Sequence, residues 1–131
     1  MLNAYIKKVA KLTSQGDSRE ESYYSTLEHL LDEYALSSGR NNIHITTLPK
    51  STEAGNPDFR VWDGKQKIVG YIEAKNPAID NLESIENSEQ LHRYRNTFPN
   101  LILTNFFEFQ LYRDGNLIRK TFIARPFIAH T

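Results

Sequence analysis

A chain of 131 residues is long enough for one domain with a single hydrophobic core and too short for two. Its 39% apolar and 24% charged residues are typical of a folded globular protein, and the lack of cysteine excludes disulfides, thiolate metal sites and cysteine nucleophiles. Sixteen basic residues balance sixteen acidic ones, so the chain as a whole lacks the positive charge of a strong nucleic-acid binder.

Two helical patterns open the chain. Apolar residues recur every three to four positions over 1–12 and again over about 18–36, which predicts two helices. Gly39 is expected to follow the second helix in the left-handed conformation. The first helix lacks the apolar segment and cleavage site of a secretory signal, and no apolar run approaches the ~20 residues of a membrane helix. We therefore expect a cytoplasmic protein.

Strand patterns dominate the rest of the chain. Turn residues separate short β-branched or apolar runs, which predict strands over 43–48, 58–62, 67–75 and 99–105 and a final hairpin over 107–122. A helix is expected over about 81–96, where it would connect two strands as a crossover. The order α-α-β-β-β-α-β-β-β predicts an α/β fold with a central mixed sheet of four to five strands, flanked by helices.

Charged residues interrupt the third predicted strand. Because side chains alternate between the faces of a strand, Glu73 and Lys75 project together from the face opposite Ile72 and Ala74. A Glu–Lys pair at a strand end is often only a solvated surface. Here, however, antiparallel pairing with the preceding strand brings Asp58 toward Glu73. We expect these charged residues to meet at one edge of the sheet.

Two converging carboxylates have a definite chemistry. They form a hard oxygen site suited to Mg²⁺ or Mn²⁺. A lysine beside them could orient or deprotonate an attacking water, or stabilise charge that builds up on a phosphate. Asp58, Glu73 and Lys75 are therefore the candidate site residues.

The same residues carry a resemblance to a known family. The sequence "PDF…GYIEAK" resembles the PD-(D/E)XK nuclease motif, with Pro57-Asp58 as its first half and Glu73-Ala74-Lys75 as its second. Gln90 and Tyr94, four residues apart, are similar to the Gln-x-x-x-Tyr element of the exonuclease-like branch of that superfamily. The downstream "FPNLILTNFFEFQLYRDG" resembles the N-terminal nuclease domain of single-chain restriction-modification enzymes (type IIG or single-polypeptide type I). The resemblance spans about 18–120.

The resemblance implies a restriction-endonuclease-like core and a role for each matching residue. Asp58, Glu73 and the backbone carbonyl of Ala74 would hold Mg²⁺ or Mn²⁺, and Lys75 would position the attacking water. Gln90 and Tyr94 would contact the DNA backbone or support the lysine.

An acidic residue from the preceding helix would complete the implied site. We favour Glu21, because it falls on the stripe of Tyr24 and the helix leucines that should meet the sheet. Glu20 and Glu28 remain alternatives.

The implied activity is metal-dependent hydrolysis of DNA phosphodiester bonds. Residues 1–131 would form one nuclease domain of a longer chain that also carries a methyltransferase and target-recognition regions, and a dimer on DNA remains open. Two other interpretations stay open: a catalytically silent module that docks DNA or a partner, and a repair or junction nuclease of the same superfamily.

Overall fold

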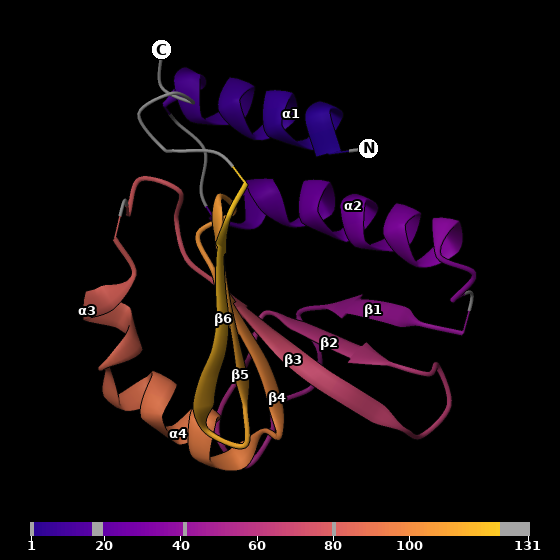
Figure 1. Cartoon of the computed structure of the whole chain (residues 1–131), viewed down its shortest axis with the longest axis vertical. Helices are drawn as coiled ribbons and strands as arrows, with labels where there is room; N and C mark the ends of the chain where they lie inside the picture. The colour runs from indigo at the N-terminus through magenta and orange to yellow at the C-terminus, as the bar shows by residue number, and fades with distance from the viewer. Residues whose placement is uncertain (1, 17–19, 41, 80, 124–131) are drawn as a thin grey trace.

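Six strands form one sheet whose spatial order follows the chain, β1-β2-β3-β4-β5-β6 (Figure 1). This computed structural model describes residues 2–16, 20–40, 42–79 and 81–123. The strands are β1 His44–Thr47, β2 Phe59–Trp62, β3 Ile68–Ala74, β4 Asn100–Thr104, β5 Glu108–Arg113 and β6 Asn116–Phe122. All neighbours pair antiparallel except β3 and β4, which are parallel. The predicted mixed sheet is confirmed, but four to five strands is wrong, since both the short β1 and the exposed β6 pair fully with their neighbours.

The first two helices cover one face of the sheet. They are α1 Leu2–Gln15 and α2 Tyr24–Ser37, and a short 3-10 helix, η1 Glu20–Tyr23, precedes α2 (Figure 1). Both predicted helices are present, but the second begins as this tighter turn rather than as an α-helix. Gly39 follows α2 with a φ of 75°, as predicted. Within the described ranges, no helix has the length and apolar character needed to cross a membrane.

The crossover between β3 and β4 contains two short helices instead of the single helix predicted over 81–96. They are α3 Glu83–Glu86 and α4 Glu89–Thr97. The first helix ends at Glu86 with Asn87 as its C-cap, and Ser88, with an extended backbone, caps the second helix: its hydroxyl accepts a hydrogen bond from the Leu91 N–H at 3.2 Å. A serine N-cap satisfies one of the free donors at a helix start, which favours a new helix here. Asp80, which the sequence predicts as the cap of the single helix over 81–96 together with Glu83, lies outside the described residues.

The sheet separates two hydrophobic clusters. Ile72 and Ala74 of β3 lie in the cluster beneath α1 and α2, whereas Tyr71 packs with the cluster that includes α4. The predicted alternation along β3 is therefore confirmed, and Glu73 projects from the α4 face. The predicted hairpin turn is also confirmed, because Asp114 and Gly115 have φ values of 51° and 84°.

Candidate active site

Asp58 lies directly before β2 and is held by both of its carboxylate oxygens. The Tyr24 hydroxyl donates a hydrogen bond to Oδ1 at 2.7 Å, and the backbone N–H of Ala74 donates one to Oδ2 at 2.8 Å. The register between β2 and β3 pairs Phe59 with Ile72, so Asp58 comes opposite Glu73. One carboxylate therefore links α2, the start of β2 and the end of β3.

Glu73 is buried beside this carboxylate, with only 4% of its surface exposed. Its Oε2 lies 3.1 Å from the Lys75 ammonium, but its buried Oε1 has no hydrogen-bond partner among the described residues. Burial and, secondly, the negative charge of Asp58 raise the pKa of Glu73 to about 7, while Lys75 opposes the shift. The site thus contains a buried carboxyl group whose Oε1 has no donor among the described residues, and which, when protonated, can share a hydrogen bond with Asp58.

Lys75 connects this pair to α4. Its ammonium also donates to the Gln90 side-chain oxygen at 3.2 Å, and the Gln90 amide nitrogen donates to the Tyr94 hydroxyl at 3.4 Å. Burial and then the charges of Glu73 and Asp58 raise the pKa of Tyr94, which places its phenol within the electrostatic reach of both carboxylates. The structure therefore brings five of the predicted side chains into one polar network.

The helix acid that faces the sheet is Glu28 rather than Glu21. Glu21 lies in η1 and is exposed, so its predicted place on the sheet-facing stripe is wrong. Since η1 is a 3-10 turn, the α-helical phase starts only at Tyr24. Glu28, one turn after Tyr24, accepts a hydrogen bond from the Thr47 hydroxyl at 3.2 Å. The side chain of Glu20 lies outside the described part of the structure.

Two inner strands, not an edge strand, carry the site. β2 and β3 are the second and third of six strands, so the charged residues do not lie on an edge strand. They lie instead at the start of β2 and the end of β3, where one antiparallel and one parallel neighbour flank β3. The chain is irregular just before β2 and just after β3. Side chains from both faces of the sheet can therefore meet at this point.

Sequence reasoning missed Tyr24 as a site residue. The sequence pattern indicates only an apolar position on the helix, yet the Tyr24 hydroxyl reaches Asp58. Tyr24 and Glu28 are four residues apart, a spacing that places both on one helix face. That spacing is the signal that could have identified this pair.

The donor set fits a divalent cation with two carboxylates. Among the described residues, no group of three or more His, Cys, Asp or Glu side chains is arranged to hold a metal. The ligands would therefore be Asp58, Glu73 and a backbone carbonyl such as that of Ala74. The unpartnered Oε1 of Glu73 supports this fit, because a buried carboxylate oxygen normally has a partner.

Gly55 shapes the loop that leads into Asp58. Its φ of 134° is rarely adopted by other residues, and an added Cβ would lie 3.2 Å from the Tyr94 hydroxyl oxygen. We expect Gly55→Ala to lower the free energy of unfolding by about 1 to 3 kcal/mol. Urea denaturation measures this loss, with Gly16→Ala as control, because Gly16 also has a positive φ, of 76°, but a Cβ there meets nothing within 4 Å. Equal losses in the two variants would contradict a specific fit between Gly55 and Tyr94.

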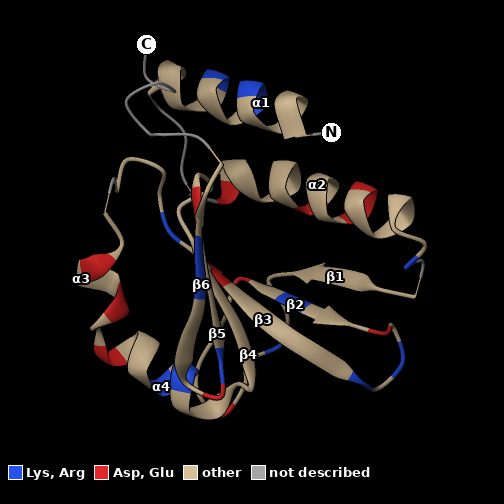
Figure 2. Cartoon of the chain, viewed as in Figure 1, with Lys and Arg blue, Asp and Glu red and all other residues tan. Residues whose placement is uncertain are grey.

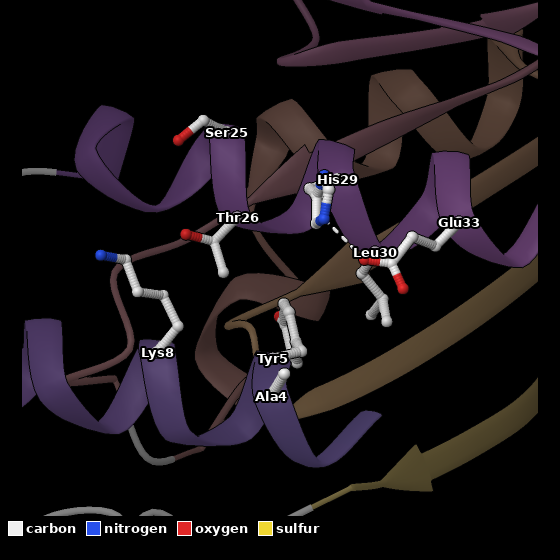
Figure 3. Close-up of a pocket in the computed structure, with 8 residues that line it drawn as sticks. All are labelled: Ala4, Tyr5, Lys8, Ser25, Thr26, His29, Leu30 and Glu33. Carbon is white, nitrogen blue, oxygen red and sulfur yellow. Dashed lines mark ion pairs between the residues drawn. The ribbon is translucent and has the colours of Figure 1, made fainter. Parts of the chain in front are cut away.

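A cavity of about 460 Å³ lies elsewhere, between α1 and α2 (Figure 3). His29 and Glu33 form an exposed ion pair of 2.6 Å along it, and Tyr5 forms part of its wall. None of the network residues lines this cavity. It therefore takes no part in the candidate site.

Comparisons with known proteins bear on the fold. No family model matches the chain, and no curated protein matches it in sequence. A chain of the DrdV–DNA complex, determined by cryo-electron microscopy, is similar in structure, with a TM-score of 0.71 and 22% sequence identity. The match covers 96% of this chain and 12% of that chain. This protein thus shares its α/β fold with a small part of a much longer chain that was solved together with DNA.

Proposed function

We propose that this protein is a Mg²⁺-dependent DNA endonuclease module that hydrolyses phosphodiester bonds. The observation that carries the proposal is the network of Asp58, Glu73 and Lys75, in which a buried carboxylate oxygen lacks a partner. Burying two neighbouring carboxylates, one of them with an oxygen that lacks a donor among the described residues, lowers stability, so such a site is typical of function rather than of packing.

Asp58, Glu73 and the carbonyl of Ala74 would hold the cation, with Mn²⁺ as an alternative to Mg²⁺. A bound divalent ion lowers the pKa of water and neutralises charge on a phosphate. The two hydrogen bonds to Asp58 hold its carboxylate in one orientation, so the side chain loses little rotamer freedom when it binds the cation. Glu28, hydrogen-bonded to Thr47 beside the start of β2, is our candidate for the helix acid in place of Glu21.

Lys75 is the proposed positioning group for the attacking water. Its side chain is 19% exposed, so its ammonium is partly shielded and can still reach a substrate phosphate. Gln90 accepts a hydrogen bond from it and thereby limits its movement, while Tyr94 supports Gln90. These two residues would act through the lysine or by touching the DNA backbone.

We further propose that the module belongs to a longer polypeptide of the restriction-modification kind, with methyltransferase and target-recognition regions. The similar chain is much longer than this one and was solved with DNA, which supports the proposal. The balanced net charge of this chain agrees with it, since other regions would then provide much of the grip on DNA.

Cleavage of supercoiled plasmid tests the nuclease proposal. We expect nicked or linear product with Mg²⁺ or Mn²⁺ and none with EDTA. Binding of Mg²⁺ is measured in parallel as a rise in melting temperature, because a ligand of the folded state stabilises it. A protein that neither cleaves nor binds the cation would contradict the proposal and favour a silent docking module.

A further inference from the structure

Arg60 and Trp62 form a stacked pair on β2. The Arg60 guanidinium carbon lies 4.2 Å from the centre of the Trp62 ring. The Trp62 indole N–H donates a hydrogen bond to the Thr46 hydroxyl of β1 at 2.8 Å. The indole is therefore fixed in place, and the guanidinium lies over its face.

The charge of Arg60 has no acidic partner within the described residues. Its buried Nε makes no hydrogen bond there, and none of the ion pairs of the described chain includes Arg60. The other arginines that pack on the protein differ from it. Arg93 and Arg95, for example, both donate to backbone carbonyls. The buried Nε is out of reach of an outside group, but a stacked guanidinium without an ion pair leaves its two terminal nitrogens available to a partner outside the protein.

Arg60 lies on the same face of the sheet as Glu73. It pairs with Tyr71, which precedes Glu73 by two residues on β3, and it follows Asp58, which lies directly before β2, by two residues. Two residues of a strand span about 6.6 Å, a distance comparable with the spacing of one or two nucleotides. Its guanidinium is stacked on Trp62. Because Trp62 lies farther along β2, the guanidinium is directed away from Asp58.

Basic residues continue this line beyond Trp62. Lys65 and Lys67 are exposed in the turn between β2 and β3, where Figure 2 shows basic positions near the end of the hairpin. The helices α1 and α2 lie over the opposite face of these strands (Figure 1). A strand of DNA could therefore run along β2 from the carboxylates toward the turn.

We propose that Arg60, held against Trp62, binds a backbone phosphate of the DNA strand one or two nucleotides from the bond that is cut. This inference rests on the proposed function, because it takes the scissile phosphate to lie at Asp58 and Glu73. The guanidinium presents two parallel donors that match phosphate oxygens. Trp62 is a positioning residue, since it acts by orienting Arg60.

DNA binding in EDTA tests the phosphate site without any need for cleavage. Fluorescence anisotropy with a short labelled duplex is measured between about 50 and 200 mM salt. We expect Arg60→Gln to raise Kd about 10-fold and to reduce the salt slope by about 1. Arg119→Gln removes the same charge from exposed β6 and should change neither value.

Arg60→Lys is a second test variant, which is used if Arg60→Gln does not fold. It retains the charge and the aliphatic stem but loses the planar fork, so we expect Kd to rise about threefold. Unchanged Kd in the folded variants, or wild-type protein that does not bind the duplex, would overturn the phosphate site. Mg²⁺-dependent cleavage with an unchanged KM in Arg60→Gln would also overturn it while leaving the nuclease intact. Arg60-dependent binding without any cleavage would support the phosphate contact and contradict the nuclease.

Discussion

Replacement of Asp58 by asparagine is expected to reduce Mg²⁺-dependent plasmid cleavage by about 100-fold or more. The substitution keeps the size of the side chain and removes the charge that a divalent cation requires. The asparagine side chain would also present an amide donor toward either the Tyr24 hydroxyl or the Ala74 N–H, and only the hydroxyl can adapt by accepting. The rate of nicking of supercoiled plasmid measures the effect.

Asp32→Asn is the matched control for this prediction. Asp32 is an exposed aspartate of α2, and its neutralisation should leave the nicking rate unchanged. Melting curves of both variants establish that they fold. The proposed role of Asp58 would be untenable if folded Asp58→Asn cleaved within about threefold of the wild-type rate, a difference of less than about 1 kcal/mol. Loss of the Mg²⁺-induced rise in melting temperature, together with loss of cleavage, would assign Asp58 to the cation.

Replacement of Glu73 by glutamine is expected to stabilise the metal-free protein above about pH 7, by as much as about 3 kcal/mol. Burial and Asp58 raise the pKa of Glu73 from 4.5 to about 7 in the folded state. Between these values the folded protein keeps a proton that the unfolded chain has lost, so the free energy of unfolding falls as pH rises. The contribution of the protonated carboxyl is complete below about pH 4.5 and is lost as pH rises through about 7. Glutamine resembles the protonated form and does not ionise.

Urea denaturation in EDTA at about pH 5 and about pH 8 tests this linkage. The stability of Glu73→Gln relative to wild type should be greater at the higher pH. Glu53→Gln, at an exposed loop position, should give no such dependence. With Mg²⁺ the order should reverse, because only wild type retains both carboxylates for the cation. A difference between Glu73→Gln and wild type that does not vary with pH would show that Glu73 ionises normally.

Local patterns in the sequence were sufficient for much of the fold. The period-2 alternation of β3 correctly placed Ile72 and Ala74 beneath α1 and α2, and Glu73 on the opposite face. Asp114-Gly115 marked the last hairpin, because consecutive positive φ angles favour such residues. Antiparallel pairing of two adjacent strands was enough to predict that Asp58 meets Glu73. Each of these inferences depends on residues that are close in the sequence.

Predictions over longer distances were less successful. The preference for Glu21 assumed a regular α-helix from residue 18, and the 3-10 turn η1 shifted the helical phase so that Glu28 faces the sheet instead. The single helix over 81–96 became two because the Ser88 cap competed with helix continuation. All six strands were predicted, but only four to five were expected in the central sheet, because pairing at the sheet's edges depends on the folded neighbours.

The sequence by itself determined the strands, the hairpin pairing and the residue types of the candidate site, since periodicity and turn chemistry act within a few residues. Only the tertiary structure decided that Tyr24 binds Asp58, that burial raises the pKa of Glu73, and that Arg60 stacks on Trp62 without an acidic partner in the described chain. Burial, cross-strand contacts and helix phase depend on residues far apart in the sequence. Their energies are therefore set by the assembled fold and not by any one segment of it.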